Sequence, residues 1–302
     1  MPVSARGSKR AIVITPALLR RWRLPLPDPD DDKRDRGVAF VVGGAAEIPG
    51  ALLLSGVAAL RAGAGKLQLA GPRSAATALA VALPEARVFA LPETGDGFLG
   101  KRAGARAGDL ARSADAVLIG PGMLGEDEIR SFMDALLPRI ADRTIVIDAV
   151  ALSALKGNRY QFRDEARVVL TPNVGEMAKI TGEAREKIEA DARGTAERFA
   201  GDSNAVVVLK GPETFIAMPY GETFRYSGGD VGLATSGSGD ILAGILVGLL
   251  ARGATLDQAA AWAVHLHGAA GNRLRQRMGL LGFLARELSD EVPPLMNALS
   301  RR

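Results

Sequence analysis

Short apolar runs recur along this chain, and longer segments rich in alanine and leucine lie between most of them. The runs are rich in β-branched residues and lie at 38–42, 66–70, 87–91, 116–119, 144–147, 168–170 and 205–209. The longer segments have helical length and lie at 51–61, 75–82, 126–140 and 186–199. Strands that are apolar on both faces and alternate with helices indicate a largely parallel sheet that is covered on both sides. We therefore predict an α/β fold of three layers, α/β/α, with the sheet in the middle.

The segments at the two ends of this pattern predict an antiparallel edge of the sheet and the N-terminal boundary of the domain. Residues 214–217 and 223–226 flank the turn sequence Pro219-Tyr-Gly-Glu222, which predicts a hairpin and hence an antiparallel edge to the sheet. Residues 25–36 are rich in proline and charge and could not bury a face, so we expect the ordered core to begin after them. Since no repeat or second composition regime follows, we predict a lead-in segment at 1–36 and a single domain at 37–302.

The composition excludes several classes of function. Lysine and arginine number 38 against 34 acidic residues, a net charge of +4 that is scattered along the chain. This excess is too small to indicate nucleic-acid binding, although it suits a small anionic ligand. The chain has no cysteine, so disulfides, thiol catalysis and zinc ribbons are excluded.

The sequence also argues against export and against a membrane span. The apolar run at 11–19 is interrupted by Pro16 and followed by Arg20 and Arg21 instead of small cleavage-site residues. No stretch of 18 uncharged apolar residues is present, because Asp240 breaks the best candidate. We therefore expect a soluble, cytoplasmic protein that binds no membrane.

The loops that follow the strands are the candidate ligand sites, because ligands of doubly wound sheets bind outside the carboxyl ends of the strands. The first, Gly43-Gly-Ala-Ala-Glu-Ile-Pro-Gly-Ala51, has glycines that permit close approach of a ligand, or it is a glycine-rich turn with no ligand. The second, Ile119-Gly-Pro-Gly-Met-Leu-Gly125, has the spacing of a dinucleotide-binding fingerprint. However, Pro121 removes an N–H from the turn, and the next strand-end acid lies too far along the chain. We reject that fingerprint and keep the loop as a ligand contact.

Three further loops place polar side chains after strands. Asp148 could hold a metal-bound water or a ribose, or it could cap the helix that follows. Asn173 and Glu176 have the spacing of a capping box, and the same spacing would let them converge on hydrated Mg²⁺ and phosphate oxygens. Lys210 suits a phosphate, although a lysine at a strand end is usually solvated. These loops leave both interpretations open.

The stretch Gly237-Ser-Gly-Asp240 carries more weight because it opens a helix that is apolar all round. The free N–H groups of such a helix form a positive end that can receive phosphate, and the glycines permit close approach. Asp240 is then either a polar cap or the base that takes a proton from an attacking hydroxyl. No Walker A sequence is present. His265 and His267 are two positions apart on a helix and point to different faces, which argues against a metal site there.

Taken in order, these loops resemble the ADP- or ATP-dependent NAD(P)H-hydrate dehydratases of the ribokinase-like superfamily. The resemblance runs from about residue 34 to 288 and rests on "GGAAEIPGALLLSGVAALRAGAGKLQLA", "LIGPGMLG", "TPNVGE", "LKGPETFIAMPYGE", "GLATSGSGDILAGILVGLLARG" and "HLHGAAGNRL". It implies a ribokinase-like fold and repair of NADH or NADPH that has gained water at C6 of the nicotinamide ring. Such an enzyme phosphorylates the C6 hydroxyl from ADP, or from ATP in eukaryotes, and phosphate then leaves.

The resemblance also implies roles for individual residues. Asp240 would be the catalytic base. The hydrated nicotinamide nucleotide would contact Ala51, Gly122, Asn173 and Asp240. The adenosine nucleotide would contact Lys210, Gly211, Pro212, Glu213, Thr214 and Gly239. The anion hole would be formed by the backbone of Gly237, Ser238, Gly239 and Asp240. Mg²⁺ would be bound mostly through water, with Glu176 as a candidate, and the protein would be a homotetramer.

Two positions depart from the family pattern. Asn173 stands where the family usually has a histidine that contacts substrate, and Arg225-Tyr-Ser-Gly228 stands where the family usually has Asn-x-Thr-Gly. The sequence Asn173-Val-Gly-Glu176 also looks like the Asn-x-x-Glu element of the sugar and vitamin kinases of the same superfamily. The alternative function is therefore an ATP-dependent kinase of a small alcohol, sugar or vitamin precursor.

Overall fold

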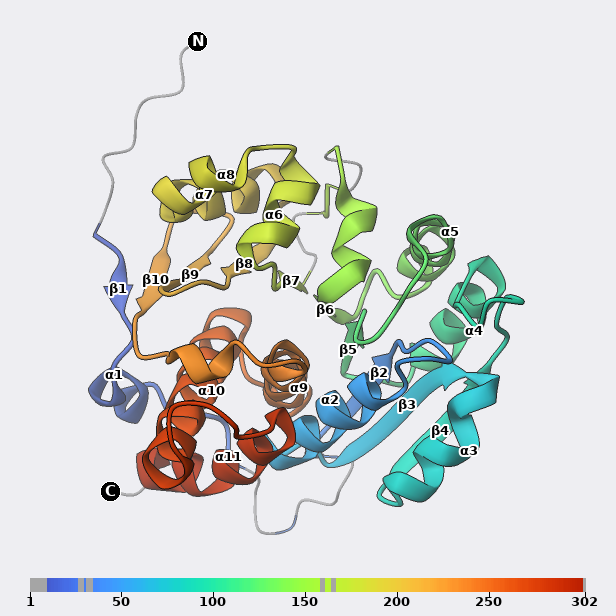
Figure 1. Cartoon of the computed structure of the whole chain (residues 1–302), viewed down its shortest axis with the longest axis horizontal. Coiled ribbons are helices and arrows are strands. Elements are labelled where there is room, and N and C mark those ends of the chain that lie inside the picture. Colours follow the sequence, from blue (N-terminus) through green and yellow to red (C-terminus); the bar gives the residue numbers. More distant parts are fainter. Residues whose placement is uncertain (1–9, 27–29, 31–34, 158–160, 164–166, 301–302) are drawn as a thin grey trace.

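A ten-stranded sheet runs through the middle of the molecule, with helices on both of its faces (Figure 1). The computed structural model describes residues 10–26, 30, 35–157, 161–163 and 167–300. The strands are β1 (Ile12–Val13), β2 (Val38–Val42), β3 (Lys66–Pro72), β4 (Ala86–Leu91), β5 (Ala116–Ile119), β6 (Thr144–Ile147), β7 (Arg167–Leu170), β8 (Val206–Leu209), β9 (Thr214–Ala217) and β10 (Thr223–Tyr226).

The helices fill the connections between the strands and the last quarter of the chain. The α-helices are α1 (Pro16–Arg21), α2 (Gly50–Arg61), α3 (Arg73–Ala82), α4 (Lys101–Ala111), α5 (Glu126–Leu136), α6 (Val174–Thr181), α7 (Arg185–Ala190), α8 (Ala192–Ser203), α9 (Ser238–Ala251), α10 (Leu256–Met278) and α11 (Ala285–Ser300). Three short 3₁₀ helices are η1 (Leu137–Arg139), η2 (Ala149–Leu155) and η3 (Val231–Leu233).

The strand order is β1-β10-β9-β8-β7-β6-β5-β2-β3-β4. All strands from β8 to β4 pair in parallel, and β9 is antiparallel to both of its neighbours. This confirms the predicted parallel sheet and the hairpin at 214–226. The chain reverses its direction across the sheet between β2 and β5, so the loops after these two strands diverge there. Such a switch point is where open α/β sheets bind ligands.

Alternation along the buried strands divides the core into two layers. In β2, Ala39 and Val41 face α2 and α9, whereas Val38, Phe40 and Val42 face the layer that contains α4 and α5. Strands β5 to β8 divide in the same way. Because both faces are covered, these strands are apolar except at Thr144 and Arg167, the first residues of β6 and β7. This is why the β-branched runs marked them in the sequence.

Helix α9 lies between the sheet and the outer helices, and glycines let it pack closely on α2. A methyl group on Gly244 would lie 2.3 Å from the Ser55 carbonyl oxygen, and one on Gly248 would lie 2.4 Å from that of Ala59. The matching steps of four residues show that the two helices run in the same direction. Both N-termini therefore lie at the carboxyl edge of the sheet.

The N-terminal segment is part of the fold, in contrast to the prediction that order begins after residue 36. Strand β1 pairs in parallel with β10 and forms the outermost strand, next to the antiparallel hairpin. Leu19 and Leu24 are buried in the core, and the Trp22 ring stacks on Phe224. Residues 1–9, 27–29 and 31–34 of the predicted lead-in lie outside the described residues.

Two predicted helices are shorter than expected. The segment at 186–199 is broken at Asp191, whose side chain accepts the Gly194 N–H and caps α8. The segment at 126–140 ends as an α-helix at Leu136 and continues as a 3₁₀ turn that contains Pro138. Both breaks have a local cause, namely an N-cap aspartate and a proline.

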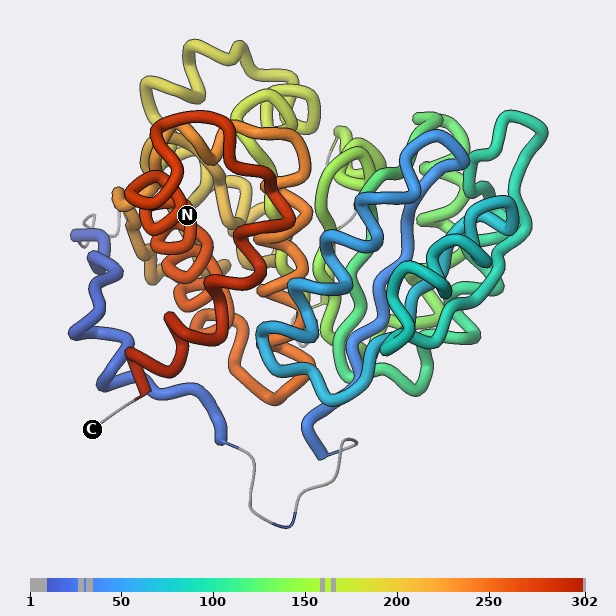
Figure 2. Tube along the Cα trace, turned by 60° about the horizontal axis from the view of Figure 1, so that its bottom comes forward, coloured from blue at the N-terminus to red at the C-terminus, as the bar shows by residue number. Residues whose placement is uncertain are grey.

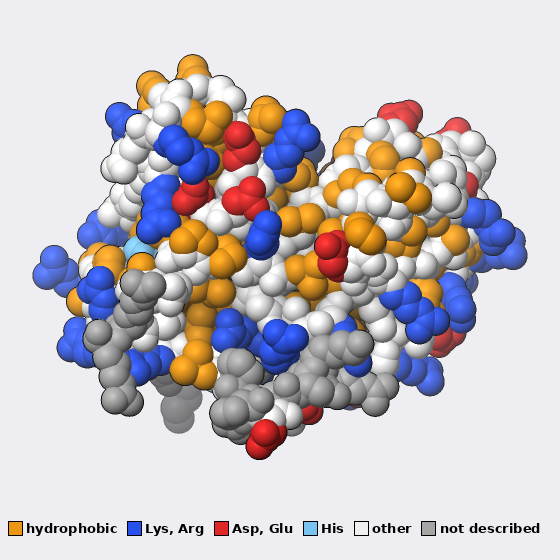
Figure 3. Space-filling model, turned by 90° about the horizontal axis from the view of Figure 1, so that it is seen from below, with side chains coloured by type: hydrophobic (Ala, Val, Ile, Leu, Met, Phe, Trp, Pro, Cys, Tyr) orange, Lys and Arg blue, Asp and Glu red, His pale blue; other side chains and the backbone are white. Residues whose placement is uncertain are grey.

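The surface and the helices agree with two features of the composition. Lysine and arginine side chains are spread over several parts of the face shown in Figure 3. No helix in the described part of the chain is long and apolar enough to cross a membrane.

Candidate active site

Three adjacent strands bring Asp148, Thr171 and Lys210 together at the carboxyl edge of the sheet. Asp148 follows β6, Thr171 follows β7 and Lys210 follows β8. Asp148 is 2% exposed and accepts hydrogen bonds from Thr171 Oγ1 at 2.6 Å and from Lys210 Nζ at 2.9 Å. The Asp148 side chain makes no capping bond to η2, so the capping interpretation is wrong. Lys210 is held in a buried ion pair and is not simply solvated.

Lys210 lies among carboxylates. The Lys210 Nζ atom is 3.8 Å from Glu176 Oε2. A methyl group on Gly239 would lie 3.6 Å from the same Nζ atom. Burial alone would lower the pKa of Lys210, but Asp148, Glu176 and Asp240 outweigh it, so the pKa is raised. A permanent cation therefore lies beside the N-terminus of α9.

Asn173 and Glu176 form a complete capping box at the start of α6. The Asn173 side chain accepts the Glu176 N–H at 2.9 Å, and Glu176 Oε2 accepts the Asn173 N–H at 2.7 Å. This confirms the structural interpretation of the pair. Burial raises the pKa of Glu176, Lys210 opposes the shift, and Asp148 adds to it.

The N-terminus of α9 has no such cap. Its N-cap residue, Gly237, has φ of 87°, and a methyl group there would lie 2.5 Å from Leu54 Cδ1. Glycine is therefore required at this turn, and the backbone N–H groups of the next residues have no side-chain acceptor from the N-cap. Asp240, in the first turn, has no hydrogen-bond partner among the described residues.

The pKa of the Asp240 carboxyl group lies well above its ordinary value of 3.8. Burial, followed by repulsion from Asp148, raises its pKa to about 7, while Lys210 opposes the shift and Glu176 adds to it. A carboxylate with a pKa near neutrality and no structural hydrogen bond is suited to accept and release a proton.

His267, which the sequence offered only as a metal ligand and which was rejected as one, contacts the first residue of α9. His267 Nε2 lies 2.8 Å from Ser238 Oγ and 3.1 Å from the Ser238 carbonyl oxygen. A carbonyl oxygen only accepts, so Nε2 carries the proton and donates. Burial lowers the pKa of His267 to about 4, so the ring is neutral. The Ser238 hydroxyl hydrogen is then free to point at a ligand.

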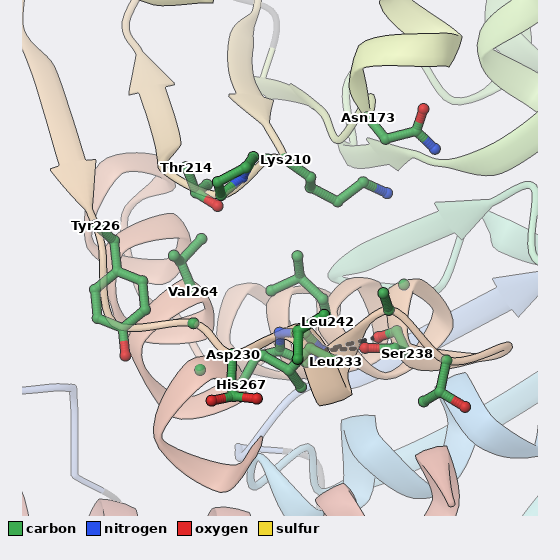
Figure 4. A pocket seen from close by; sticks show the side chains of 18 residues that line it. Asn173, Lys210, Thr214, Tyr226, Asp230, Leu233, Ser238, Leu242, Val264 and His267 are labelled. Carbon is green, nitrogen blue, oxygen red and sulfur yellow. Dashed lines mark hydrogen bonds between the residues drawn. The ribbon is translucent and has the colours of Figure 1, made fainter. Parts of the chain in front are cut away.

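Lys210, Ser238 and His267 line a cavity of about 700 Å³. The predicted site residues Glu176, Gly237 and Asp240 do not line it, although Asp240 directly follows the lining residue Gly239. Figure 4 shows Lys210 and Thr214 on one side, Ser238 and His267 on the other, and Asn173 beyond the Lys210 amine. The predicted site residues that line this first cavity are Asn173, Lys210, Gly211, Pro212, Thr214, Ser238 and Gly239. Its volume is typical of a pocket for a small molecule or nucleotide.

The other predicted residues lie near this cavity or point elsewhere. Ala51 and Gly122 meet at the switch point, where the Gly44 N–H donates to the Pro121 carbonyl and a methyl group on Gly122 would lie 2.9 Å from the Ala51 methyl. Neither residue lines the first cavity. Glu213 forms an ion pair with Arg225 at 2.8 Å.

The site has the parts that phosphoryl transfer needs. An uncapped helix N-terminus attracts phosphate, Lys210 supplies a cation, and Asp240 is a carboxylate with a pKa near neutrality. In the described residues, no group of three or more histidine, aspartate or glutamate side chains is arranged to bind a metal ion. The His265 and Tyr226 rings form a T-shaped pair with centroids 5.6 Å apart.

Known NAD(P)H-hydrate dehydratases are similar to this chain in sequence and in structure. A relative from Xanthomonas campestris, named ADP-dependent (S)-NAD(P)H-hydrate dehydratase, is 45% identical over 97% of this chain and 98% of its own length. A Bacillus subtilis protein of the same name is 33% identical over 90% of this chain and 94% of its own length. The solved structure of the Bacillus subtilis ADP/ATP-dependent NAD(P)H-hydrate dehydratase, co-crystallised with ATP and Mg²⁺, covers 97% of this chain and all of its own, with 30% identity and a TM-score of 0.85.

The likeness to kinases is weaker. The hydroxyethylthiazole kinase of Pyrococcus horikoshii shares the fold with a TM-score of 0.57 and 19% identity. By contrast, the model of the NAD(P)H-hydrate dehydratase family matches residues 39–294. The chain therefore belongs to the NAD(P)H-hydrate dehydratase family and has its ribokinase-like fold.

Proposed function

We infer that this protein is an ADP-dependent (S)-NAD(P)H-hydrate dehydratase, a lyase that restores NADH or NADPH from their C6 hydrates. The observation that carries the chemistry is the N-terminus of α9, where Asp240 has a pKa raised to about 7 and lies next to Lys210 and free backbone N–H groups. The alternative function, a kinase of a small alcohol, is not retained, because the relatives at 45% and 33% identity carry the dehydratase name.

The reaction needs two steps because hydroxide is a poor leaving group. The Asp240 carboxylate accepts the proton of the C6 hydroxyl, and the C6 oxygen attacks the terminal phosphorus of ADP. The bond from that phosphorus to the bridging oxygen breaks, and AMP leaves. The C6–O bond then breaks with release of inorganic phosphate, assisted by the ring nitrogen. Loss of a proton from C5 restores the ring double bond.

The surroundings of Asp240 stabilise the charge that moves in the first step. Lys210 neutralises phosphate charge, and Asp148 and Thr171 keep its amine in place. The N–H groups at the start of α9 bind the transferred phosphoryl group. His267 donates to Ser238, so the Ser238 hydroxyl can donate to the same group.

Mg²⁺ fits this site mainly as an ion bound to the nucleotide and to water. Asp148 Oδ1 already pairs with Lys210, and Glu176 Oε2 already accepts the Asn173 N–H, so one oxygen of each carboxylate is engaged within the protein. Glu176 would hold such an ion through water. When bound, Mg²⁺ offsets the charge of the phosphates.

The remaining roles are proposals that rest on family membership. We propose that Ala51, Gly122 and Asn173 contact the hydrated nicotinamide nucleotide. ADP would contact Gly239 and the five residues Lys210, Gly211, Pro212, Glu213 and Thr214. We further propose that residues 37–302 form one catalytic domain, to which the strand and helix at 12–21 are added at the sheet edge. We also propose that the protein is cytoplasmic and that it assembles as a homotetramer.

The test is to incubate the protein with hydrated NADH, Mg²⁺ and either ADP or ATP. We expect the near-ultraviolet absorbance of reduced nicotinamide to return with ADP, together with equal amounts of AMP and inorganic phosphate. Phosphorylation of a panel of alcohols by ATP, without recovery of NADH from either nucleotide, would contradict the proposed function.

A further inference from the structure

A second cavity, of about 570 Å³, lies on the other side of the loop that leads into α9. One wall is formed by α2, with Leu53 and Val57, and the other by the start of α11, with Arg286 and Ser289. Helix α11 packs against both α2 and α9, as Figure 2 shows. The second cavity is therefore framed by α2, by the start of α11 and by Thr235 and Ser236 of the loop before α9.

The two cavities meet at the catalytic turn. Thr235 lines both of them. Gly50, in the wall of the second cavity, directly precedes Ala51. A methyl group on Gly237 would lie 3.2 Å from the Ala285 methyl and 3.9 Å from Asp240 Oδ2. The second cavity thus adjoins the base from the α2 side, whereas the first cavity adjoins it from the Lys210 side.

The walls of the second cavity combine apolar surface with one buried hydroxyl and one exposed guanidinium. Leu53, Val57 and Leu284 supply apolar surface for a planar ring. Ser289 is 1% exposed, and its hydroxyl has no hydrogen-bond partner within the described residues. A buried hydroxyl without a partner indicates a ligand or water that the chain itself does not supply. Arg286 is exposed and forms no ion pair with another described residue.

The substrate has a part that the first cavity does not accommodate. A dinucleotide hydrate carries an AMP half in addition to the nicotinamide half that must reach Asp240. The first cavity, with Lys210 and Thr214, serves the adenine nucleotide co-substrate, so the AMP half needs separate space. A volume of about 570 Å³ lies in the usual range for ligand pockets. Its single guanidinium complements a phosphate.

We propose that the second cavity binds the AMP half of the hydrated dinucleotide. Arg286 pairs with a phosphate of that half, the apolar side chains of α2 pack on its adenine ring, and the Ser289 hydroxyl hydrogen-bonds to it. This assignment rests on the proposed function and specifies the subsite that makes the substrate a dinucleotide.

The test compares two substrates that differ only by the AMP half, namely hydrated NADH and the hydrate of reduced nicotinamide mononucleotide. In Arg286→Gln, we expect KM for hydrated NADH to rise by about tenfold, because a charge-assisted bond is lost. The value of kcat, KM for ADP and KM for the mononucleotide should stay unchanged. Val57→Trp, which fills the cavity from a partly exposed position, should show the same pattern.

Arg61→Gln is the matched control, because Arg61 is an arginine on the same pair of helices that does not line the cavity; it joins α2 to α11 through Asp290 at 2.9 Å. It should change none of these constants. Equal changes in KM for both hydrates, or no change for either in Arg286→Gln and Val57→Trp, would overturn the AMP subsite while the function stands. Absence of turnover of both hydrates by the unmodified protein would instead overturn the proposed function, and the subsite with it.

Discussion

Helices α6 and α9 begin at the same edge of the sheet, and each carries an acid in its first turn at the third helical position. In α6, the N-cap Asn173 has an extended backbone. Its side chain accepts the Glu176 N–H, and its own backbone N–H donates to the Glu176 carboxylate. In α9, the N-cap is Gly237 in the left-handed conformation, and Asp240 is bound to no described side chain or backbone group. The same acid position is therefore a cap in one helix and a free carboxylate in the other.

The difference arises from the residue before the helix. An asparagine at the N-cap accepts one N–H group and positions its own N–H for the acid, so both groups are used within the protein. A glycine at the N-cap has no acceptor, and it leaves the first N–H groups for a ligand. An acid at the start of a helix thus indicates catalysis only when the N-cap cannot engage it.

The strongest test of this comparison is Asp240→Asn. We expect kcat to fall by about 10²- to 10⁴-fold, because the amide cannot accept the proton of the C6 hydroxyl. The melting temperature should not fall, since Asp240 makes no capping bond and since Asn removes repulsion from Asp148 and Glu176. Recovery of NADH and a thermal melt of the same preparation measure both. A variant with more than a tenth of the parent rate would return Asp240 to a structural role.

Lys210→Met tests the cation beside that base. The change leaves Asp148 buried without its ion-pair partner, so the free energy of unfolding should fall by about 3–5 kcal/mol. The double variant Lys210→Met with Asp148→Asn should recover part of that stability, because Asp148, the most buried ion-pair partner of Lys210, is then neutral. It should stay inactive with ADP if Lys210 binds phosphate. Chemical denaturation and turnover of hydrated NADH separate the two effects, and an active double variant would contradict the role in phosphate binding.

The pH dependence tests the ionisation of Asp240 directly. With a pKa of about 7, the base is protonated in acid, so kcat/KM should rise about tenfold per pH unit below 7 and level off above it. The stability effect has the opposite direction. A raised pKa means that the folded state favours the protonated acid, so this contribution is complete below 3.8 and is lost as the pH rises through 7. Asp240→Asn should therefore be more stable than the parent above pH 7. If the free energy of unfolding of the two proteins had the same dependence on pH, the raised pKa would be contradicted.

Most of the fold could be predicted because its signals are local. The runs at 38–42, 116–119 and 144–147 match β2, β5 and β6 to the residue, since strands buried on both faces need continuous apolar sequence. Strand β1 could not be found, because its two residues are exposed and take their order only from pairing with β10. The break at Asp191 was missed because the apolar pattern continues across it.

The sequence predicted which loops carry the candidate site, but not which side chains bond to one another within it. Strand ends and glycines marked where Asp148, Lys210 and Asp240 lie. The bond between Lys210 and Asp148 joins residues 62 positions apart, so only the strand order brings the two together. His267 gave no usable signal, since a histidine inside a helix is ambiguous until Ser238 is seen to lie beside it.

The smallest expected effect concerns Asn173, where the family usually has histidine. As a cap, Asn173→Ala should lower the free energy of unfolding by about 1 kcal/mol, and Asn173→Asp should not, because aspartate caps equally well. Denaturation curves of the three proteins measure this difference. Asn173 also lines the first cavity, so KM for hydrated NADH is the second readout. If Asn173→Ala raises that KM about tenfold without loss of stability, the capping box is incidental and α6, like α9, presents its first turn to the ligand.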